Sequence, residues 1–228
     1  MAVKLFYKIL IIILAVPIFI ACNKKSSKQE QEKESMDTIS EILEEPSEII
    51  DSDFNFEEAV AGTKAPKHIL DQITLIDVRY LSTDGKIHKG QILVNQKIEK
   101  ETEAIFKFML ENKFVIHQVV PIVKYNWDDN LSMKANNSYG FCYRDIMNSN
   151  KKSKHSLGMA IDINPIFNPI RWNSPNKHLP NIPDGAVHDT TVNGTLYSGH
   201  PVVNEMKRLG FRWGNQFKKY SDDHHFEK

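Results

Sequence analysis

Hydrophobic and polar positions change their spacing along the chain, and each spacing predicts a type of element. Residues 73–81 alternate in part between apolar and polar side chains, Asp84-Gly85 is a turn sequence, and 86–95 is again rich in β-branched residues. This arrangement predicts a β-hairpin. Residues 96–112 instead space their apolar side chains as one face of a helix, at Ile98, Ile105, Phe106 and Met109.

Shorter segments complete the pattern. Strands are predicted at 114–120, 136–144, 159–163, 211–213 and 224–227, and a helix at 201–209 ends before Gly210. No internal repeat or heptad pattern occurs. The mixture predicts an α+β fold with a small central antiparallel sheet and two or three helices.

Residues 164–197 follow none of these periods. They hold five of the ten prolines but also several large apolar side chains. Loops of this length are usually functional or disordered, and this one is too apolar for plain disorder. We expect an ordered loop that lies across the domain and walls a substrate groove.

The amino terminus has the pattern of an export signal. Lys4 and Lys8 precede an apolar run at 9–21, which is shorter than the roughly 20 residues a transmembrane helix needs. Residues 19–22, Phe-Ile-Ala-Cys, resemble the bacterial lipoprotein signal. The resemblance implies that Cys22 is lipidated and that the protein is exported and anchored to a membrane, at the periplasmic or cell surface; the alternative is an ordinary secretory signal with an incidental Cys.

Charge divides the rest of the chain. The 29 basic and 29 acidic residues cancel overall, but 23–58 holds four Lys against 12 acidic residues, and 59–228 holds 23 basic against 17 acidic residues. We therefore predict a signal peptide at 1–22, a disordered acidic tether at 23–60 and one domain at 61–228. Only two Cys are present, which excludes a disulfide framework. The small basic excess is weak support for a polyanionic partner, and we expect no nucleic-acid binding.

Two short motifs carry candidate chemistry. Residues 153–162 read Ser-Lys-His-Ser-Leu-Gly-Met-Ala-Ile-Asp, and 222–226 read Asp-Asp-His-His-Phe. His155, Asp162 and His225 would supply the three ligands of a catalytic zinc site. His155 and Asp162 are seven positions apart, so they converge only if the chain bends between them, and Gly158 permits such a bend. Composition alone leaves other sets open, including one with His178 and His188.

Residues 153–162 also resemble a known family. They fit the S-x-H-x-x-G-x-A-x-D pattern of the D-alanyl-D-alanine metallopeptidases at every fixed position, and 136–144, 210–214 and 222–227 resemble further elements of the family in the same order. The likeness covers about residues 70–228. It implies the small α+β core that these zinc peptidases share with lysostaphin-type enzymes and Hedgehog signalling domains.

The resemblance assigns roles position by position. It implies that His155, Asp162 and His225 bind Zn²⁺ and that Asp222 is the general base. It also implies that Arg144 binds the substrate carbonyl. At the carboxyl end Asp223 could replace Asp222, and His224 could replace His225, because neighbouring side chains of a strand point to opposite faces.

Three further positions bear on the site. Ser153 and Trp213 are weaker candidates for substrate contact, as loop-bonding and core packing are their other interpretations. Asn215 stands where the family often has a second Gly, and Asn tolerates the left-handed backbone that a turn can require.

These observations predict a zinc-dependent peptidoglycan peptidase that acts as a monomer on cell-wall stem peptides. Either a D-Ala-D-Ala carboxypeptidase or an L-Ala-D-Glu endopeptidase fits. One alternative is a lipoprotein that binds cell-wall peptides or a protein without cleaving them. Metal storage is a third, weaker interpretation, because nearly all His are isolated in the sequence.

Overall fold

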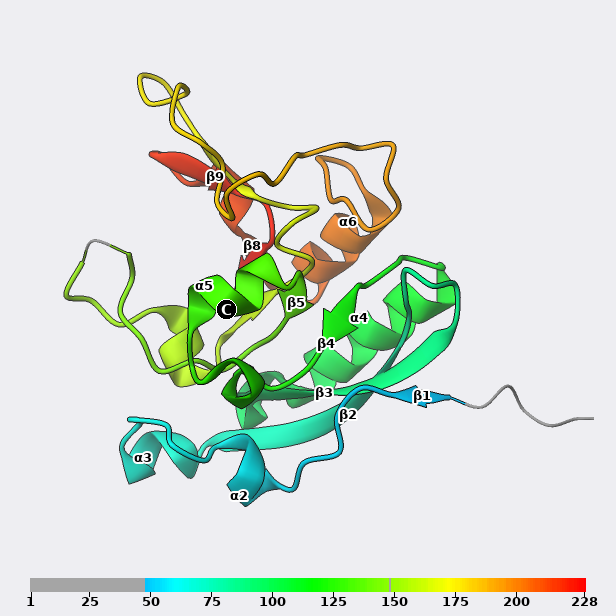
Figure 1. The fold of residues 1–228 in the computed structure, drawn as a ribbon, viewed down its shortest axis with the longest axis vertical. Helices are drawn as coiled ribbons and strands as arrows, with labels where there is room; N and C mark the ends of the chain where they lie inside the picture. Colours follow the sequence, from blue (N-terminus) through cyan, green and yellow to red (C-terminus); the bar gives the residue numbers. More distant parts are fainter. Residues whose placement is uncertain (1–47, 148) are drawn as a thin grey trace, which may run out of the picture. The chain divides into compact units, whose positions relative to one another are not determined.

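A computed structural model describes residues 48–147 and 149–228 (Figure 1). The predicted signal peptide with Cys22, and most of the predicted tether, lie outside these residues. Among the helices that are described, none is both long enough and apolar enough to span a membrane.

The strands are mostly short, apart from one long pair. They are β1 (Ile49–Ile50), β2 (Ile73–Leu81), β3 (Ile87–Asn95), β4 (Gln118–Val119), β5 (Asn137–Ser138), β6 (Ala160–Asp162), β7 (Ile170–Trp172), β8 (Arg212–Trp213), β9 (Tyr220–Asp222) and β10 (His225–Glu227).

Five α-helices lie among the strands. They are α2 (Phe56–Ala59), α3 (Lys67–Leu70), α4 (Glu99–Glu111), α5 (Asp129–Lys134) and α6 (Pro201–Arg208). Single 3₁₀ turns occupy η1 (Gln96–Ile98), η2 (Ile122–Tyr125), η3 (Lys154–Leu157) and η4 (Gly214–Gln216).

The strands form four small sheets in the described part of the chain. Two have three strands, in the orders β1-β3-β2 and β6-β10-β8, and two are the pairs β4-β5 and β7-β9. The fold is α+β as predicted, but the expectation of one central antiparallel sheet is wrong. Two of the pairs, β1 with β3 and β4 with β5, are parallel.

The predicted hairpin and long helix are confirmed. β2 and β3 pair antiparallel from Ile73↔Asn95 to Leu81↔Ile87. β2 buries Ile76, Val78 and Tyr80 and exposes Asp77 and Arg79 between them, which is the alternation expected of a strand with one face on a core.

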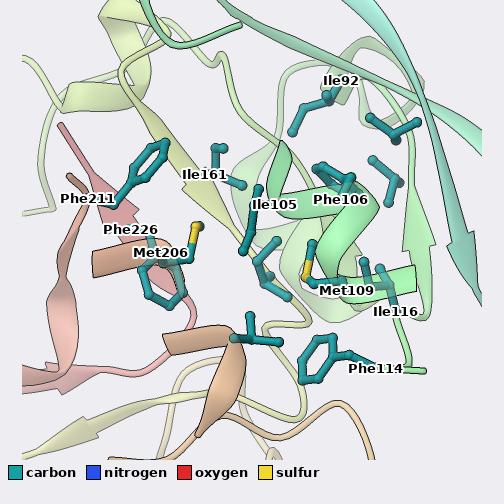
Figure 2. Close-up of a cluster of buried hydrophobic side chains, with 14 of the residues drawn as sticks. Ile92, Ile105, Phe106, Met109, Phe114, Ile116, Ile161, Met206, Phe211 and Phe226 are labelled. Atoms are coloured by element: carbon teal, nitrogen blue, oxygen red, sulfur yellow. The ribbon is translucent and has the colours of Figure 1, made fainter. Parts of the chain in front are cut away.

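Helix α4 joins the two three-stranded sheets through one hydrophobic core (Figure 2). Its buried face carries Ile105, Phe106 and Met109, each at most 1% exposed. Figure 2 shows Ile92 of β3 on one side of this helix and Met206 of α6 with Phe226 of β10 on the other. Burial of such side chains contributes roughly 1.5–3 kcal/mol each, so this core fixes β10 relative to β3.

Residues 48–60, which the sequence assigns to the tether, are described and contact the domain. β1 adds to the edge of β3, and the backbone NH of Asp51 donates to the carbonyl of Lys89. The Asp51 carboxylate accepts from the hydroxyl of Tyr80 and lies 3.0 Å from His88 Nδ1. These long-range contacts order a segment whose acidic composition alone indicates disorder.

The proline-rich stretch at 164–197 is ordered against the domain, as predicted. Asn168 is fully buried, and its amide nitrogen donates to the carbonyls of Ile163 and Gly194 while its amide oxygen accepts from the NH of Leu196. Arg171 Nε lies 2.5 Å from Asp223 Oδ2. Whether the loop walls a substrate groove stays a prediction.

Candidate metal centre and active site

The candidate site forms where the last strand pairs with β6. The register of β10 and β6 places His225 opposite Asp162. His155 comes from the turn η3 just before β6, and Gly158 ends that turn with φ +65°. The predicted bend between His155 and Asp162 is therefore confirmed, and it brings both side chains to one side of the sheet.

Three donor atoms converge at this point. His155 Nε2 lies 3.1 Å from His225 Nδ1 and 3.2 Å from Asp162 Oδ1, and His225 Nδ1 lies 3.0 Å from the same carboxylate oxygen. All three side chains are buried. No second group of three metal-ligating side chains gathers elsewhere in the described residues.

The dimensions of this triangle fit a zinc ion. Zinc bonds of about 2.0–2.1 Å at tetrahedral angles hold neighbouring ligand atoms about 3.3 Å apart, close to the three observed separations. Two imidazoles and one carboxylate are also a donor set that Zn²⁺ accepts in catalytic sites, with a fourth position left for water.

Neighbouring groups orient both imidazoles. His155 Nδ1 lies 2.6 Å from the carbonyl oxygen of Gly140, which can only accept, so the proton sits on Nδ1 and leaves the Nε2 lone pair for a metal. His225 Nε2 lies 3.1 Å from Glu227 Oε2, which leaves Nδ1 facing the triangle. The ring of Tyr139 stacks on His155 at 5.0 Å between centroids.

The charges at the triangle reinforce each other. Burial alone would raise the pKa of Asp162, but the imidazoles of His155 and His224 outweigh it and hold that pKa well below its usual value. Burial alone would lower the pKa of His225, but its hydrogen bonds with Asp162 and Glu227 raise it to about 10. The carboxylate is thus ready to bind a cation, whereas His225 must first lose a proton.

Asp222 lies at the end of β9, beside the triangle. It is 8% exposed, and its Oδ1 is 3.1 Å from Nε2 of His224. The same nitrogen lies 3.8 Å from Oδ2 of Asp162. Burial raises the pKa of Asp222. A carboxylate with a raised pKa is suited to take up and release a proton near neutral pH.

The alternatives at Asp223 and His224 separate cleanly in space. Asp223 is fully buried but faces the long loop, where it accepts from Asn215 Nδ2 at 2.6 Å and pairs with Arg171. His224 faces Asp222, and its Nε2 lies outside the donor triangle. Of the two imidazoles His225 is therefore the one that joins the donor triangle, and of the two carboxylates Asp222 is the one that faces His224.

Arg144 reaches the site through an aromatic neighbour. Its Nε lies 3.0 Å from Asp129 Oδ2, and its Nη2 donates to the hydroxyl of Tyr139 at 3.3 Å. The same hydroxyl donates to Asp129. Because the ring of Tyr139 stacks on His155, the guanidinium is held one residue away from the donor triangle.

The two weaker candidates have structural roles in the molecule. The Ser153 hydroxyl accepts from the NH of His155 and so begins the turn η3. Trp213 is 3% exposed, stacks on Phe226 in the core and donates from Nε1 to the carbonyl of Asp223. Contact of either side chain with substrate stays a prediction.

Other side chains considered from the sequence lie apart from the site. Burial raises the pKa of the Cys142 thiol to about 12, which fits an inert thiol. His188 Nε2 donates to the carbonyl of Leu196 at 2.7 Å, and His178 is exposed. The backbone of Asn215 is not left-handed. Its side-chain amide instead donates a hydrogen bond to the Asp223 carboxylate.

The sequence does not predict the roles of three residues around the site. Glu227 stands two positions after His225, and that spacing on a strand places both on one face, which was a usable signal. Asp129 and Tyr139 precede Arg144 by 15 and 5 positions, and nothing in that spacing indicates that they hold it.

Comparison with known proteins supports the carboxyl-terminal part of this site. A family model described as D-alanyl-D-alanine carboxypeptidase, from a family of zinc peptidases, matches residues 147–228. The match contains His155, Asp162, Asp222 and His225 but not Arg144, and it confirms the resemblance over this segment. No curated protein and no solved structure matches the chain.

Proposed function

We propose that this protein is a zinc-dependent peptidase that cleaves the stem peptides of peptidoglycan, as a D-Ala-D-Ala carboxypeptidase or an L-Ala-D-Glu endopeptidase. The observation that carries the proposal is the buried triangle of His155, Asp162 and His225, which lies inside the segment that matches the peptidase family.

The chain's own groups suit hydrolysis by water. A bound zinc ion supplies Lewis acidity and lowers the pKa of a water to about 7. Asp222 accepts the proton of the attacking water and later donates it to the leaving amine. The buried setting of Asp222, which raises its pKa, supports both transfers.

Arg144 stabilises the carbonyl oxygen of the peptide bond that is cleaved. Negative charge gathers on the carbonyl oxygen of the peptide in the transition state, and a fixed cation stabilises it without reorganisation. Asp129 and Tyr139 hold the guanidinium in place before substrate arrives.

The decisive experiment incubates the purified full chain with cell-wall stem peptides and follows their masses. We expect loss of a terminal D-Ala, or a cut between L-Ala and D-Glu, and no cleavage in excess chelator. Asp222→Ala is expected to lower the rate about 10²–10⁴-fold while one zinc per chain is retained. Asp53→Ala, at an exposed aspartate near the amino end of the described residues, is the matched control and should leave the rate unchanged. Undiminished cleavage in chelator refutes the zinc mechanism.

A non-catalytic peptide-binding protein is the competing function. A binder has no need of a buried carboxylate beside the donor triangle, and Asp222 is such a group. Retained binding of wall fragments with unchanged masses would favour the binder.

The same proposal places the protein at a membrane surface through a lipid on Cys22. The sequence around Cys22 is the only support for this part of the proposal. Labelling of cells with a radioactive fatty acid should mark the wild-type chain and not Cys22→Ser. Equal labelling of both chains would refute it.

A further inference from the structure

His224 is a buried imidazole to which the mechanism above gives no task. It is 2% exposed and lies between the proposed base and a proposed metal ligand. Both of its ring nitrogens have polar neighbours. Nδ1 lies 2.7 Å from the carbonyl oxygen of Asn168, and Nε2 lies 3.1 Å from Asp222 Oδ1 and 3.8 Å from Asp162 Oδ2.

The Asn168 side of this ring is rigid. The Asn168 amide is buried and bonded to the carbonyls of Ile163 and Gly194 and to the NH of Leu196. The carbonyl of His224 accepts from the NH of Ile163 at 3.0 Å, which fixes its backbone as well. A ring held at Nδ1 and at its backbone has little freedom to move Nε2.

The carboxylate of Asp222 has few other groups to hold its orientation. Oδ1 of Asp222 is buried, and no described residue offers it an aligned hydrogen bond. Among the Lys, Arg and His nitrogens of the described chain, only Nε2 of His224 lies within 4 Å of an Asp222 oxygen. A buried carboxylate oxygen without a partner carries a large desolvation cost, so its orientation depends on this one neighbour.

We propose that His224 is a positioning residue, which transmits the rigidity of the Asn168 anchor to Asp222 and holds its carboxylate toward the donor triangle. The inference rests on the proposed function of Asp222 as the base. His224 is not itself a ligand, because its Nε2 faces the second oxygen of Asp162 rather than the oxygen that joins the triangle.

Both ring nitrogens of His224 face groups that can accept a hydrogen. A ring with hydrogens on both nitrogens has an acceptor for each, the carbonyl of Asn168 and the carboxylate of Asp222.

The test compares two substitutions of His224 in the full chain. Leu keeps a similar volume without a donor, whereas the amide nitrogen of Gln can reach the position of Nε2. We expect His224→Leu to lower kcat about 10–100-fold with KM and zinc content unchanged, because a base displaced by about 1 Å costs rates of this order. His224→Gln should recover most of the loss.

A double-mutant cycle separates positioning from general damage. When Asp222→Ala is already present, His224→Leu should cause no further loss, because its effect passes through Asp222. Wild-type kcat in His224→Leu, loss of zinc from that variant, no recovery in His224→Gln, or independent effects in the cycle would each overturn the proposal.

A measurement without substrate keeps the two proposals distinguishable. The ¹⁵N resonance of His224 Nε2 should shift between the wild-type and Asp222→Ala chains if the imidazole and the carboxylate form an ion pair at 3.1 Å; an unchanged resonance overturns the positioning role. This measurement does not use His224→Leu, so it still tests the positioning role when that variant does not fold. A wild-type chain that cleaves no stem peptide refutes the proposed function, while the resonance still tests the contact.

Discussion

Zinc binding to the ion-free protein is expected to release at least one proton at pH 7.5, and His225 is its main source. Nδ1 of His225 faces Asp162 at 3.0 Å, and Nε2 faces Glu227 at 3.1 Å. These two acceptors raise the pKa of His225 to about 10. A metal at the triangle must take the place of the Nδ1 proton, whereas the Nε2 proton stays with Glu227.

The size of the effect follows from that pKa. With a pKa of about 10, His225 at pH 7.5 is protonated roughly 300 times more often than not, and removing the proton costs about 3 kcal/mol. Because the pKa is raised, the proton opposes zinc at every pH below about 10. The apparent affinity should therefore rise about tenfold per pH unit between pH 7 and 9 from this group alone.

Calorimetry can count the protons. Titrating zinc into the ion-free chain at one pH, in buffers with different ionisation enthalpies, gives the number released per zinc. Glu227→Ala removes one acceptor, so the pH at which proton release falls to half should move lower. His68→Gln, at an exposed histidine, should change nothing. Release of less than half a proton at pH 7.5 would refute the reasoning.

Three further outcomes are expected. In chelator, the free energy of unfolding should fall as pH rises from about 6.5 to about 10, because over that window the folded state keeps the His225 proton that the unfolded state has already lost; a flat denaturant-unfolding series contradicts this. Gly158→Ala should destabilise the protein by about 2–4 kcal/mol, because φ is +65° and the new Cβ would lie 2.6 Å from a backbone nitrogen. The control Gly85→Ala, at φ +79° with nothing within 4 Å of the new Cβ, should cost about 1 kcal/mol. Equal losses of Tm in the two variants would show that the close approach at Gly158 is unimportant. Asn215→Ala should cost about 1–3 kcal/mol by leaving the buried Asp223 short of a donor, with zinc affinity unchanged in a chelator competition.

The elements that the sequence predicts well are those with long, regular patterns. The hairpin of β2 and β3 and the helices α4 and α6 lie within a few residues of their predicted bounds. Each has enough consecutive residues for a period of 2 or 3.6 to stand out. Their apolar faces are also the faces that form the core.

The short elements are set by contacts that no local pattern contains. β1 exists because Glu48–Asp51 docks on the edge of β3. β7 and β9 exist because they pair with each other across 52 positions, Ile170 with Asp222. Two or three residues are too few to show a period. Such strands follow from the tertiary structure rather than from propensity.

The site divides in the same way. The donor triangle was predictable because residues 153–162 and 222–226 resemble the motifs of a metallopeptidase family, whereas composition alone left other sets open. The group that orients His155 is a backbone carbonyl, at Gly140, and a carbonyl has no signature in a sequence. The resemblance implied Asp222 rather than Asp223, but only the structure shows that Asp223 faces Arg171 and Asn215.

The four consecutive buried polar residues from Asp222 to His225 make this segment intolerant of insertions and deletions. Asp222 and His224 face each other, Asp223 secures the long loop, and His225 completes the donor triangle. Adding or deleting a single residue upstream of His225 in the β9–β10 connection would exchange these tasks between neighbours. We therefore expect relatives to vary side chains around this tetrapeptide while the number of residues between β9 and β10 stays constant.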